Sequence, residues 1–337
     1  MSNAVEVPGI DHASVTAWFT EHVDDVTAPL QFELIAGGRS NLTYHVRDAA
    51  SGHWVLRRPP TGHLLSTAHD VVREWRVLDA IADTPVPVPP VVGSCTDPAV
   101  TGADFYVMRY VDGVILDGDD TVAGIEPSAR QFASIDIVDT LAAIHAVDTD
   151  TGPLAEFRRP GSYLERQLRR WHRQLEAGGI TSGPLIELHD ALTRAIPAER
   201  WTGLVHGDYR PGNLIIGPDG HVRAVLDWEM WTVGDVMADV GWLAAWGVPG
   251  AGGWVPDPAD GFLDIDAVCA RYAETTGRDL SDLNYYHAFA LWRLAAIAEG
   301  VYQRFRDGAM GDQDVDIEEL AERPVLLAER SFQILSE

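Results

Sequence analysis

The chain has 337 residues, of which 46% are hydrophobic and 23% are charged, as in ordinary globular proteins. Its formal net charge of -26 argues against sequence-independent binding to nucleic acid or to anionic membrane surfaces. The length is sufficient for two lobes, each with its own core.

The expected location is the cytoplasm. Cys95 and Cys269 are the only cysteines, so neither a disulfide framework nor a cysteine-rich zinc site is indicated. The first residues show no basic region followed by an apolar stretch, so we expect no signal peptide. The most apolar helical segment, 288–298, is too short to span a membrane. The sequence leaves the oligomeric state open.

The N-terminal part has strand-like patterns. Residues 29–58 alternate between apolar and polar side chains and contain two turns, at 36–41 and 49–52, which predicts a three-stranded antiparallel meander. Residues 69–82 have apolar side chains at helical spacing, with Asp70 near the start. The proline-rich segment 85–90 predicts an extended connector, and residues 105–111 a buried strand.

Helical patterns dominate the rest of the chain, at 127–147, 161–177, 184–196, 236–246, 262–276, 281–307 and 315–335. We therefore predict an α+β fold in three parts. Residues 1–27 form an N-terminal helical extension, residues 28–110 an N-lobe, and residues 111–337 a C-lobe. Between two of the predicted helices, residues 214–216 and 222–226 form a hairpin around the turn at 217–220.

Three polar residues surround this hairpin. Asp208 precedes it, Asn213 lies at its entry and Asp227 at its exit. A carboxylate near an attacking hydroxyl, with an amide and a carboxylate as oxygen ligands for Mg²⁺, is the arrangement that phosphoryl transfer needs. The alternative is a hairpin whose aspartates only cap turns.

The motif His206-Gly207-Asp208, followed by Asn213 and Asp227, resembles that of the aminoglycoside phosphotransferase family. The resemblance implies a bilobal protein-kinase-like fold with a small antiparallel N-lobe sheet, one N-lobe helix and a mostly helical C-lobe. It also implies transfer of a phosphoryl group from ATP, or alternatively GTP, to a hydroxyl of a small molecule, with Mg²⁺. In this reading Asp208 meets the acceptor hydroxyl, Asn213 and Asp227 hold the metal, and His206 supports the loop by hydrogen bonds.

The same resemblance assigns a nucleotide-covering loop. Gly37, Gly38, Ser40 and Asn41 lie between two predicted strands, where glycines let backbone N–H groups approach phosphate oxygens. The backbone of Met108 and Tyr110 is the implied hinge that binds the base.

The third strand of the meander ends in two arginines, where kinase-like folds present a lysine to the phosphates. Arg57 is the implied phosphate-binding residue, paired with Glu74 on the following helix, and Arg58 is its rival. Arginine offers a bidentate donor in a different geometry from lysine.

The segment between Asp227 and Asp239 is too short for an activation loop, which argues for a small-molecule acceptor rather than a protein. Asp235 and Asp239 predict caps or loop anchors, with bracing of the catalytic loop as a second role for Asp239. Two sets of residues are candidates for acceptor binding. Carboxylates would suit a cationic acceptor, and the candidates are Asp282, Glu299, Glu229 and Asp235. Aromatic side chains would suit an apolar acceptor, and the candidates are Trp171, Trp242, Trp246, Tyr285, Tyr286, Trp292 and Tyr302.

Among phosphotransferases, the strings around His206, Gly37 and Arg57 look closest to a subgroup that includes kinase domains fused to acyl-CoA dehydrogenases. Their hydroxyacyl-CoA substrates favour a metabolite as the acceptor, with an aminoglycoside-like antibiotic as the other acceptor class. Two alternatives stay open. One is a catalytically weak nucleotide-binding pseudokinase, which the missing lysine favours, and the other is a kinase-fold nucleotidyltransferase.

Overall fold

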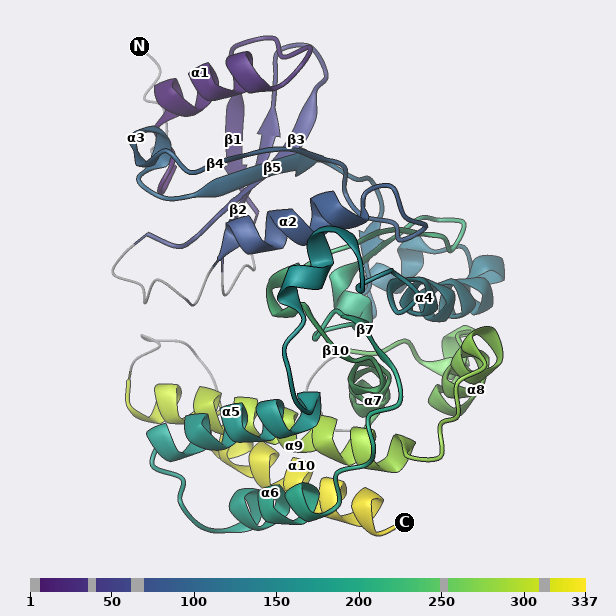
Figure 1. Cartoon of the computed structure of the whole chain (residues 1–337). Coiled ribbons are helices and arrows are strands. Elements are labelled where there is room, and N and C mark those ends of the chain that lie inside the picture. The colour runs from purple at the N-terminus through teal and green to yellow at the C-terminus, as the bar shows by residue number, and fades with distance from the viewer. Residues whose placement is uncertain (1–6, 36–40, 62–69, 249–253, 309–315) are drawn as a thin grey trace. The chain divides into compact units, whose positions relative to one another are not determined.

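The computed structural model of the chain describes residues 7–35, 41–61, 70–248, 254–308 and 316–337 (Figure 1). These residues belong to two compact units. The first unit comprises Met1–Gly113 together with Arg223–Trp231, and the second comprises Val114–Val222 together with Thr232–Glu337. The segment after the hairpin turn, which contains Asp227, therefore belongs to the first unit.

The first unit contains a five-stranded antiparallel sheet. Its strands are β1 (Gln31–Leu34), β2 (Leu42–Arg47), β3 (His53–Arg58), β4 (Val91–Cys95) and β5 (Phe105–Arg109). They are arranged in the order β1-β2-β3-β5-β4, with Tyr44 opposite Leu56 and Leu56 opposite Val107. The predicted meander is present as β1 to β3, and the predicted buried strand as β5. Strand β4, which the sequence patterns did not predict, completes the edge.

Two helices cover opposite faces of this sheet. Helix α1 (His12–His22) contributes Trp18 and Phe19 to a core that also contains Trp54 and Leu56 of β3. Helix α2 (Val71–Ile81) starts at its N-cap Asp70 and packs on the other face. Because successive strand residues point to opposite faces, β3 directs Arg57 and Arg58 to different sides. A short helix, α3 (Pro98–Thr101), lies between β4 and β5.

The second unit is mostly helical. The seven helical segments predicted after residue 126 are all present, with ends shifted by a few residues. They are α4 (Arg130–Ile144), α5 (Tyr163–Ala177), α6 (Pro184–Arg194), α7 (Met237–Trp246), α8 (Ile265–Thr276), α9 (Leu283–Arg306) and α10 (Ile317–Ser336). None of the helices in the described ranges is both long and apolar enough to cross a membrane.

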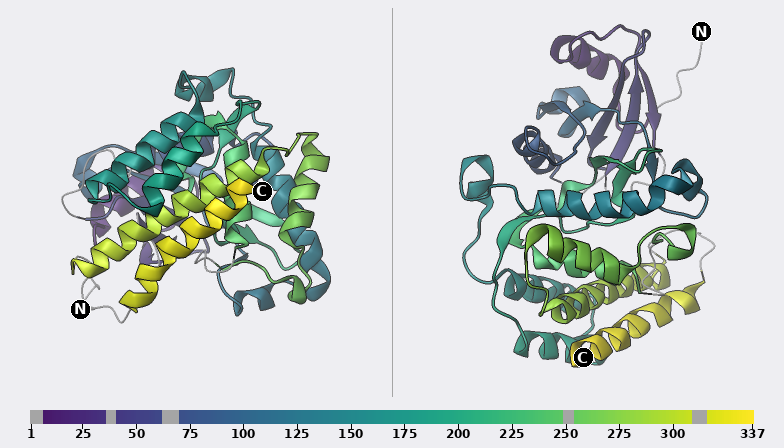
Figure 2. Two further views of the ribbon diagram at one scale, coloured as in Figure 1. Left: turned by 90° about the horizontal axis from the view of Figure 1, so that it is seen from below. Right: turned by 90° about the vertical axis from the view of Figure 1, so that its right-hand side faces the viewer.

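Helices α7 and α9 form the centre of this unit. Nearly all of α7 is buried, as expected for a helix that is apolar on every side. Gly241 lets it approach α9 closely, since a Cβ atom there would lie 2.4 Å from the carbonyl oxygen of Tyr286. Helix α10 lies beside α9 (Figure 2), and the Ser331 hydroxyl donates to the Ala288 carbonyl at 2.7 Å.

Short strands in the second unit position the loop that carries the motif. Strand β7 (Thr202–Val205) pairs antiparallel with β10 (Thr232–Asp235), and β6 (Val114–Ile115) pairs antiparallel with β8 (Leu214–Ile216). Residues 206–213 connect β7 to β8. The predicted hairpin turn follows β8, with the Gly217 N–H donating to the His221 carbonyl at 2.8 Å, and β9 (Val222–Val225) comes next.

Candidate active site

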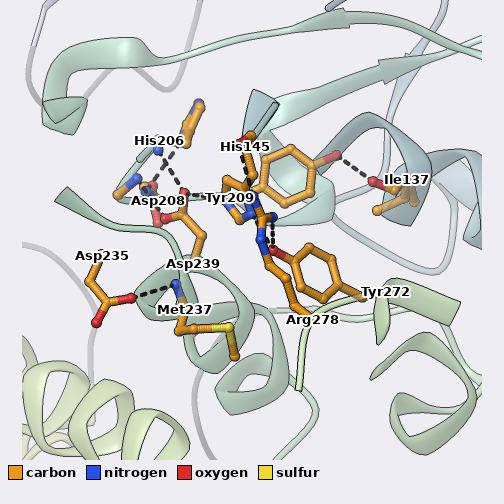
Figure 3. A network of polar contacts seen from close by, with 11 residues as sticks. Ile137, His145, His206, Asp208, Tyr209, Asp235, Met237, Asp239, Tyr272 and Arg278 are labelled. Atoms are coloured by element: carbon orange, nitrogen blue, oxygen red, sulfur yellow. Dashed lines mark hydrogen bonds and ion pairs between the residues drawn. The ribbon is translucent and has the colours of Figure 1, made fainter. Parts of the chain in front are cut away.

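The loop after β7 is held at its backbone by Asp239, near the start of α7. The buried Asp239 carboxylate accepts hydrogen bonds from the backbone N–H groups of His206, at 2.7 Å, and Gly207, at 2.8 Å. Gly207 has a φ of 86°, a conformation that favours glycine at this turn. Asp239 therefore braces the loop, in the second of the two roles that the sequence suggested for it (Figure 3).

A buried polar network supports this brace. His145 Nε2 lies 3.3 Å from Asp239 Oδ2, and His145 Nδ1 lies 2.7 Å from the Tyr272 hydroxyl. Arg278 donates to the same hydroxyl at 2.7 Å and to the His145 carbonyl at 3.1 Å. Burial lowers the pKa of His145. Burial also acts to raise the pKa of Asp239, but the hydrogen bond from His145 and its other donors hold it below the usual value.

His206 supports the loop from inside. Its side chain is fully buried, and its Nδ1 atom accepts a hydrogen bond from the Asp208 backbone N–H at 3.2 Å. The next aromatic residue, Tyr209, is also buried and donates from its hydroxyl to the Ile137 carbonyl of α4 at 2.6 Å. These contacts fit a supporting role for His206.

The Asp208 carboxylate is oriented by its own neighbours. Trp242 Nε1 donates to Oδ1 at 2.9 Å, and Asn213 Nδ2 donates to Oδ2 at 2.8 Å. Arg210 Nε lies 3.5 Å from Oδ2. The side chain is 23% exposed, so it is positioned from several directions while part of it still reaches solvent. Such a carboxylate can accept a hydrogen bond from an incoming hydroxyl.

Asn213 fits a metal-ligand role through the direction of its amide. Its Nδ2 group donates both to the Asp208 backbone carbonyl, at 2.8 Å, and to the Asp208 carboxylate, at 2.8 Å. Because both partners are acceptors, they fix which end of the amide carries the protons. The Oδ1 atom accepts no hydrogen bond in the described part of the chain. Carbonyl and carboxylate oxygens are ligands that Mg²⁺ prefers.

The first unit brings together three of the predicted site residues. Arg57 of β3 lies between two carboxylates, with its Nε 3.2 Å from Glu74 Oε2 and its Nη2 2.6 Å from Asp227 Oδ1. Glu74 is almost completely buried, and burial raises the pKa of its carboxyl to about 7, although Arg57 acts in the opposite direction. Asp227 has a φ of 62°, in the left-handed region that short polar side chains tolerate.

Arg58 points to the other face of the sheet. Its guanidinium donates to the Gly9 carbonyl, and its side chain is buried among residues of the N-terminal segment. Arg57 rather than Arg58 is therefore the arginine that pairs with Glu74, as period-two alternation along β3 requires.

The other nucleotide-side predictions are only partly visible. Gly37, Gly38 and Ser40 lie outside the described residues. Asn41 is buried, and its Oδ1 atom has no hydrogen-bond partner within the described ranges.

The predicted hinge residues differ from each other in exposure. Met108 is buried in β5, whereas Tyr110 is exposed and stacks on His45 with ring centroids 4.6 Å apart. The backbone N–H of Tyr110 donates to the His53 carbonyl at 3.2 Å. This N–H is therefore already engaged within the first unit, and the predicted contact to a base depends on other backbone groups of the segment.

Three of the four carboxylates suggested for a cationic acceptor have internal partners. Asp235 is fully buried and accepts from the Tyr286 hydroxyl at 2.6 Å and from the Met237 N–H at 3.1 Å. Asp282 pairs with Arg200, and Glu299 accepts from Gln303 at 3.0 Å. Asp235 is thus an anchor and not an acceptor ligand.

Two of the aromatic candidates lie in contact with Arg293, whose side chain approaches the loop that carries Asp208. Arg293 lies 4.0 Å from the Trp242 ring centroid and 5.4 Å from that of Trp171. Arg293 is buried and donates to the Gly207 carbonyl at 2.7 Å, and burial lowers its pKa. The sequence contains no local signal for this residue, because α9 follows the loop by about eighty residues.

Within the described residues, no group of three or more His, Cys, Asp or Glu side chains has the geometry of a metal site. The predicted magnesium ligands include an amide and are divided between the units, with Asn213 in the second and Asp227 in the first. Their joint action on one ion stays a prediction.

Comparison with known proteins places these residues in context. A family model described as "Phosphotransferase enzyme family" (APH) matches residues 31–275. Acyl-CoA dehydrogenase family member 10 of Mus musculus is 36% identical over 292 residues, covering 84% of this chain. The match covers 27% of the mouse protein, so the chain spans about a quarter of the length of that relative.

Solved structures are similar over almost the whole chain. A proposed aminoglycoside phosphotransferase from Ralstonia eutropha JMP134 has 32% identity and a TM-score of 0.81, covering 97% of this chain and 98% of that one. A thermostable mutant of aminoglycoside phosphotransferase APH(4)-Ia, in ternary complex with AMP-PNP and hygromycin B, has 17% identity and a TM-score of 0.60, covering 96% and 98%. The latter shows likeness of fold alone. Together they confirm the predicted α+β, protein-kinase-like fold class.

Proposed function

Because the chain belongs to the phosphotransferase enzyme family (APH), we propose that it transfers the γ-phosphoryl group of ATP to a hydroxyl of a small molecule, with Mg²⁺. The observation that carries this proposal is the arrangement around Asp208. Its partly exposed carboxylate is oriented by Trp242 and Asn213, on a loop that Asp239 braces. A turn-capping aspartate would need none of this support.

In the proposed reaction, Asp208 accepts a hydrogen bond from the attacking hydroxyl and orients its lone pair toward phosphorus. The new oxygen–phosphorus bond forms as the bond to the bridging oxygen of ATP breaks, and ADP leaves with that electron pair. The hydroxyl proton passes to the Asp208 carboxylate and then to solvent. His206 and Asp239 keep the loop in place and exchange no proton with the substrate.

The remaining site residues are assigned to binding of the metal and the nucleotide. Asn213 and Asp227 would hold Mg²⁺, which neutralises phosphate charge when bound. Arg57, held by Glu74, would contact the phosphates in place of the usual lysine. Gly37, Gly38, Ser40 and Asn41 would cover the nucleotide, and the backbone around Met108 and Tyr110 would contact the base. The AMP-PNP complex of the related fold supports ATP, with GTP as the alternative donor.

We propose a neutral or anionic metabolite as the acceptor, in the cytoplasm. Three of the four carboxylates suggested for a cationic acceptor, Asp235, Asp282 and Glu299, have internal partners, and two arginines flank Asp208. The match to an acyl-CoA dehydrogenase family member agrees with a metabolic acceptor. Hygromycin B, bound in a distant relative, keeps an aminoglycoside-like antibiotic as the competing acceptor.

A substrate screen tests the proposal. The purified protein, with ATP or GTP and Mg²⁺, is incubated with a panel of hydroxyl compounds that includes hydroxyacyl-CoAs, amino alcohols, sugars and aminoglycosides. We expect nucleoside diphosphate release that depends on one class of acceptor and is lost in Asp208→Ala. Mg²⁺-dependent nucleotide binding without turnover would instead favour a pseudokinase, and a nucleotide added to the acceptor would favour nucleotidyl transfer.

A further inference from the structure

Arg210 is the more exposed of the two arginines that flank Asp208. It follows Asp208 by two residues in the loop, and its Nε atom lies 3.5 Å from the Asp208 Oδ2 atom. Its side chain is 32% exposed, whereas Arg293 is buried and already donates to the Gly207 carbonyl. Of these two cations, Arg210 is therefore the one that a ligand arriving at Asp208 can meet.

The guanidinium of Arg210 is held in a defined position by its neighbours. Its central carbon lies 5.3 Å from the Trp246 ring centroid, on α7. On another side it lies against Gly212, where a Cβ atom would be 2.2 Å from Nη1. Trp246 in turn packs edge-on against Trp242, which donates to Asp208. The arginine is thus positioned by the same elements that position the carboxylate.

This position leaves the ends of the guanidinium without hydrogen-bond partners among the described residues. In the part of the chain that the structure describes, neither Nη1 nor Nη2 of Arg210 donates a hydrogen bond. These two nitrogens carry N–H groups in a planar fork, which matches pairs of oxygens on a phosphoryl group. A positioned, unpaired fork beside a candidate catalytic carboxylate indicates a site for an anionic group.

A phosphoryl group transferred to a hydroxyl held by Asp208 would pass at a distance that the Arg210 side chain can span. A hydroxyl bound to Asp208 lies about 2.6–3.2 Å from the carboxylate. The phosphorus lies about 3–3.5 Å beyond the attacking oxygen. A guanidinium that starts 3.5 Å from the same carboxylate therefore extends over the distance at which the phosphoryl oxygens pass.

We infer that Arg210 is a further catalytic residue, which donates hydrogen bonds to the transferred phosphoryl group; this inference rests on the proposed function. The negative charge of the transferred group would otherwise be brought next to Asp208 in a chain with a net charge of -26. Arg210 compensates that charge through hydrogen bonds alone, so the balance of bonds and protons in the reaction is unchanged.

Gly212 provides a way to displace the guanidinium without removing it. We would compare Arg210→Ala, Arg210→Lys, Gly212→Ala and the double variant Arg210→Ala/Gly212→Ala. Arg330→Ala, at an exposed position of α10, is the matched loss of an arginine. Two reactions are followed for each protein: ATP hydrolysis with Mg²⁺ and water as acceptor, and transfer to the acceptor found in the screen. Circular dichroism and thermal unfolding check that each variant folds.

We expect Arg210→Ala to lower kcat about a hundredfold in both reactions, with little change in the KM for either substrate. Arg210→Lys should recover part of this loss. Gly212→Ala should lower kcat when Arg210 is present. It should cause no further loss of kcat when it is combined with Arg210→Ala. Arg330→Ala should match the wild type.

Three results would overturn the inference. One is wild-type kcat in folded Arg210→Ala. Another is a raised KM for the acceptor with unchanged ATP hydrolysis, which would place Arg210 on the acceptor instead. The third is an equal effect of Gly212→Ala with and without Arg210. Failure of the wild type to turn over ATP with any acceptor or with water would overturn the proposed function itself, and the inference with it.

Discussion

Replacing Asp239 with Asn tests how strongly its carboxylate holds the loop 206–213. The buried carboxylate accepts from two backbone N–H groups, of His206 and Gly207, at 2.7 and 2.8 Å, one on each oxygen. Asparagine offers one acceptor oxygen and one NH₂ group of almost the same shape. At least one backbone N–H would then face a donor, and it would lose its partner in a buried position.

The expected cost follows from these contacts. A hydrogen bond to a charged group contributes about 1.5–3 kcal/mol, and an unsatisfied buried group costs about 1–3 kcal/mol. We therefore expect Asp239→Asn to lower the free energy of unfolding by about 3 kcal/mol. The measurement is urea denaturation followed by circular dichroism, with ATP turnover measured on the folded fraction.

Asp235→Asn is the matched control, because it removes another buried carboxylate four residues earlier in the chain. Asp235 accepts from one hydroxyl and one N–H, and an amide can replace both contacts by donating to the Tyr286 hydroxyl. Burial also raises the pKa of Asp235 to about 6, so its charge is not favoured. We expect a loss below about 1 kcal/mol. Equal losses in Asp239→Asn and Asp235→Asn would refute the reasoning.

Three further predictions concern other contacts. Burial lowers the pKa of His287 to about 4, below its usual value near 6.5, so the unfolded chain binds more protons between these pH values and stability should fall as pH drops from 6.5 to 4. Urea unfolding at several pH values should show this slope reduced in His287→Gln, and an unchanged slope would contradict it. Trp242→Phe removes a donor to Asp208 and should lower kcat about tenfold with an unchanged KM for ATP; steady-state kinetics decides, and an unaltered kcat would count against the contact. Calorimetry should find Mg²⁺–ATP binding weakened about tenfold in Arg57→Ala and unchanged in Arg58→Ala, and the opposite ranking would disprove the assignment.

Local sequence patterns predicted most of the secondary structure because the capping residues and the spacing of apolar side chains favour the helices and strands that form. Asp70 caps α2 as expected, with its carboxylate accepting from the Arg73 N–H at 2.8 Å. Strand β4 was missed for a physical reason. It follows a proline-rich connector, and it contains Gly93, where its pairing with β5 is irregular. Its place in the sheet comes from β5, a partner that local sequence does not reveal.

The candidate site also contains some residues that the sequence indicated and others that it did not. The spacing of Asp208 and Asn213 indicated the catalytic loop, and the structure places their side chains in contact. Arg293 gave no signal, and Trp242 was predicted only as one of several aromatic candidates for acceptor binding, because both reach the loop from helices far along the chain. Alternation on β3 separated Arg57 from Arg58, but only the position of α2 shows which face carries Glu74.

Mass spectrometry of the acceptor tests the central claim most directly. The acceptor from the screen is incubated with ATP and Mg²⁺, together with wild-type protein, Asp208→Ala or Arg330→Ala. We predict that wild type and Arg330→Ala add one phosphate to a hydroxyl oxygen and that folded Asp208→Ala does not. An added nucleotide, or equal phosphorylation by Asp208→Ala, would contradict the account.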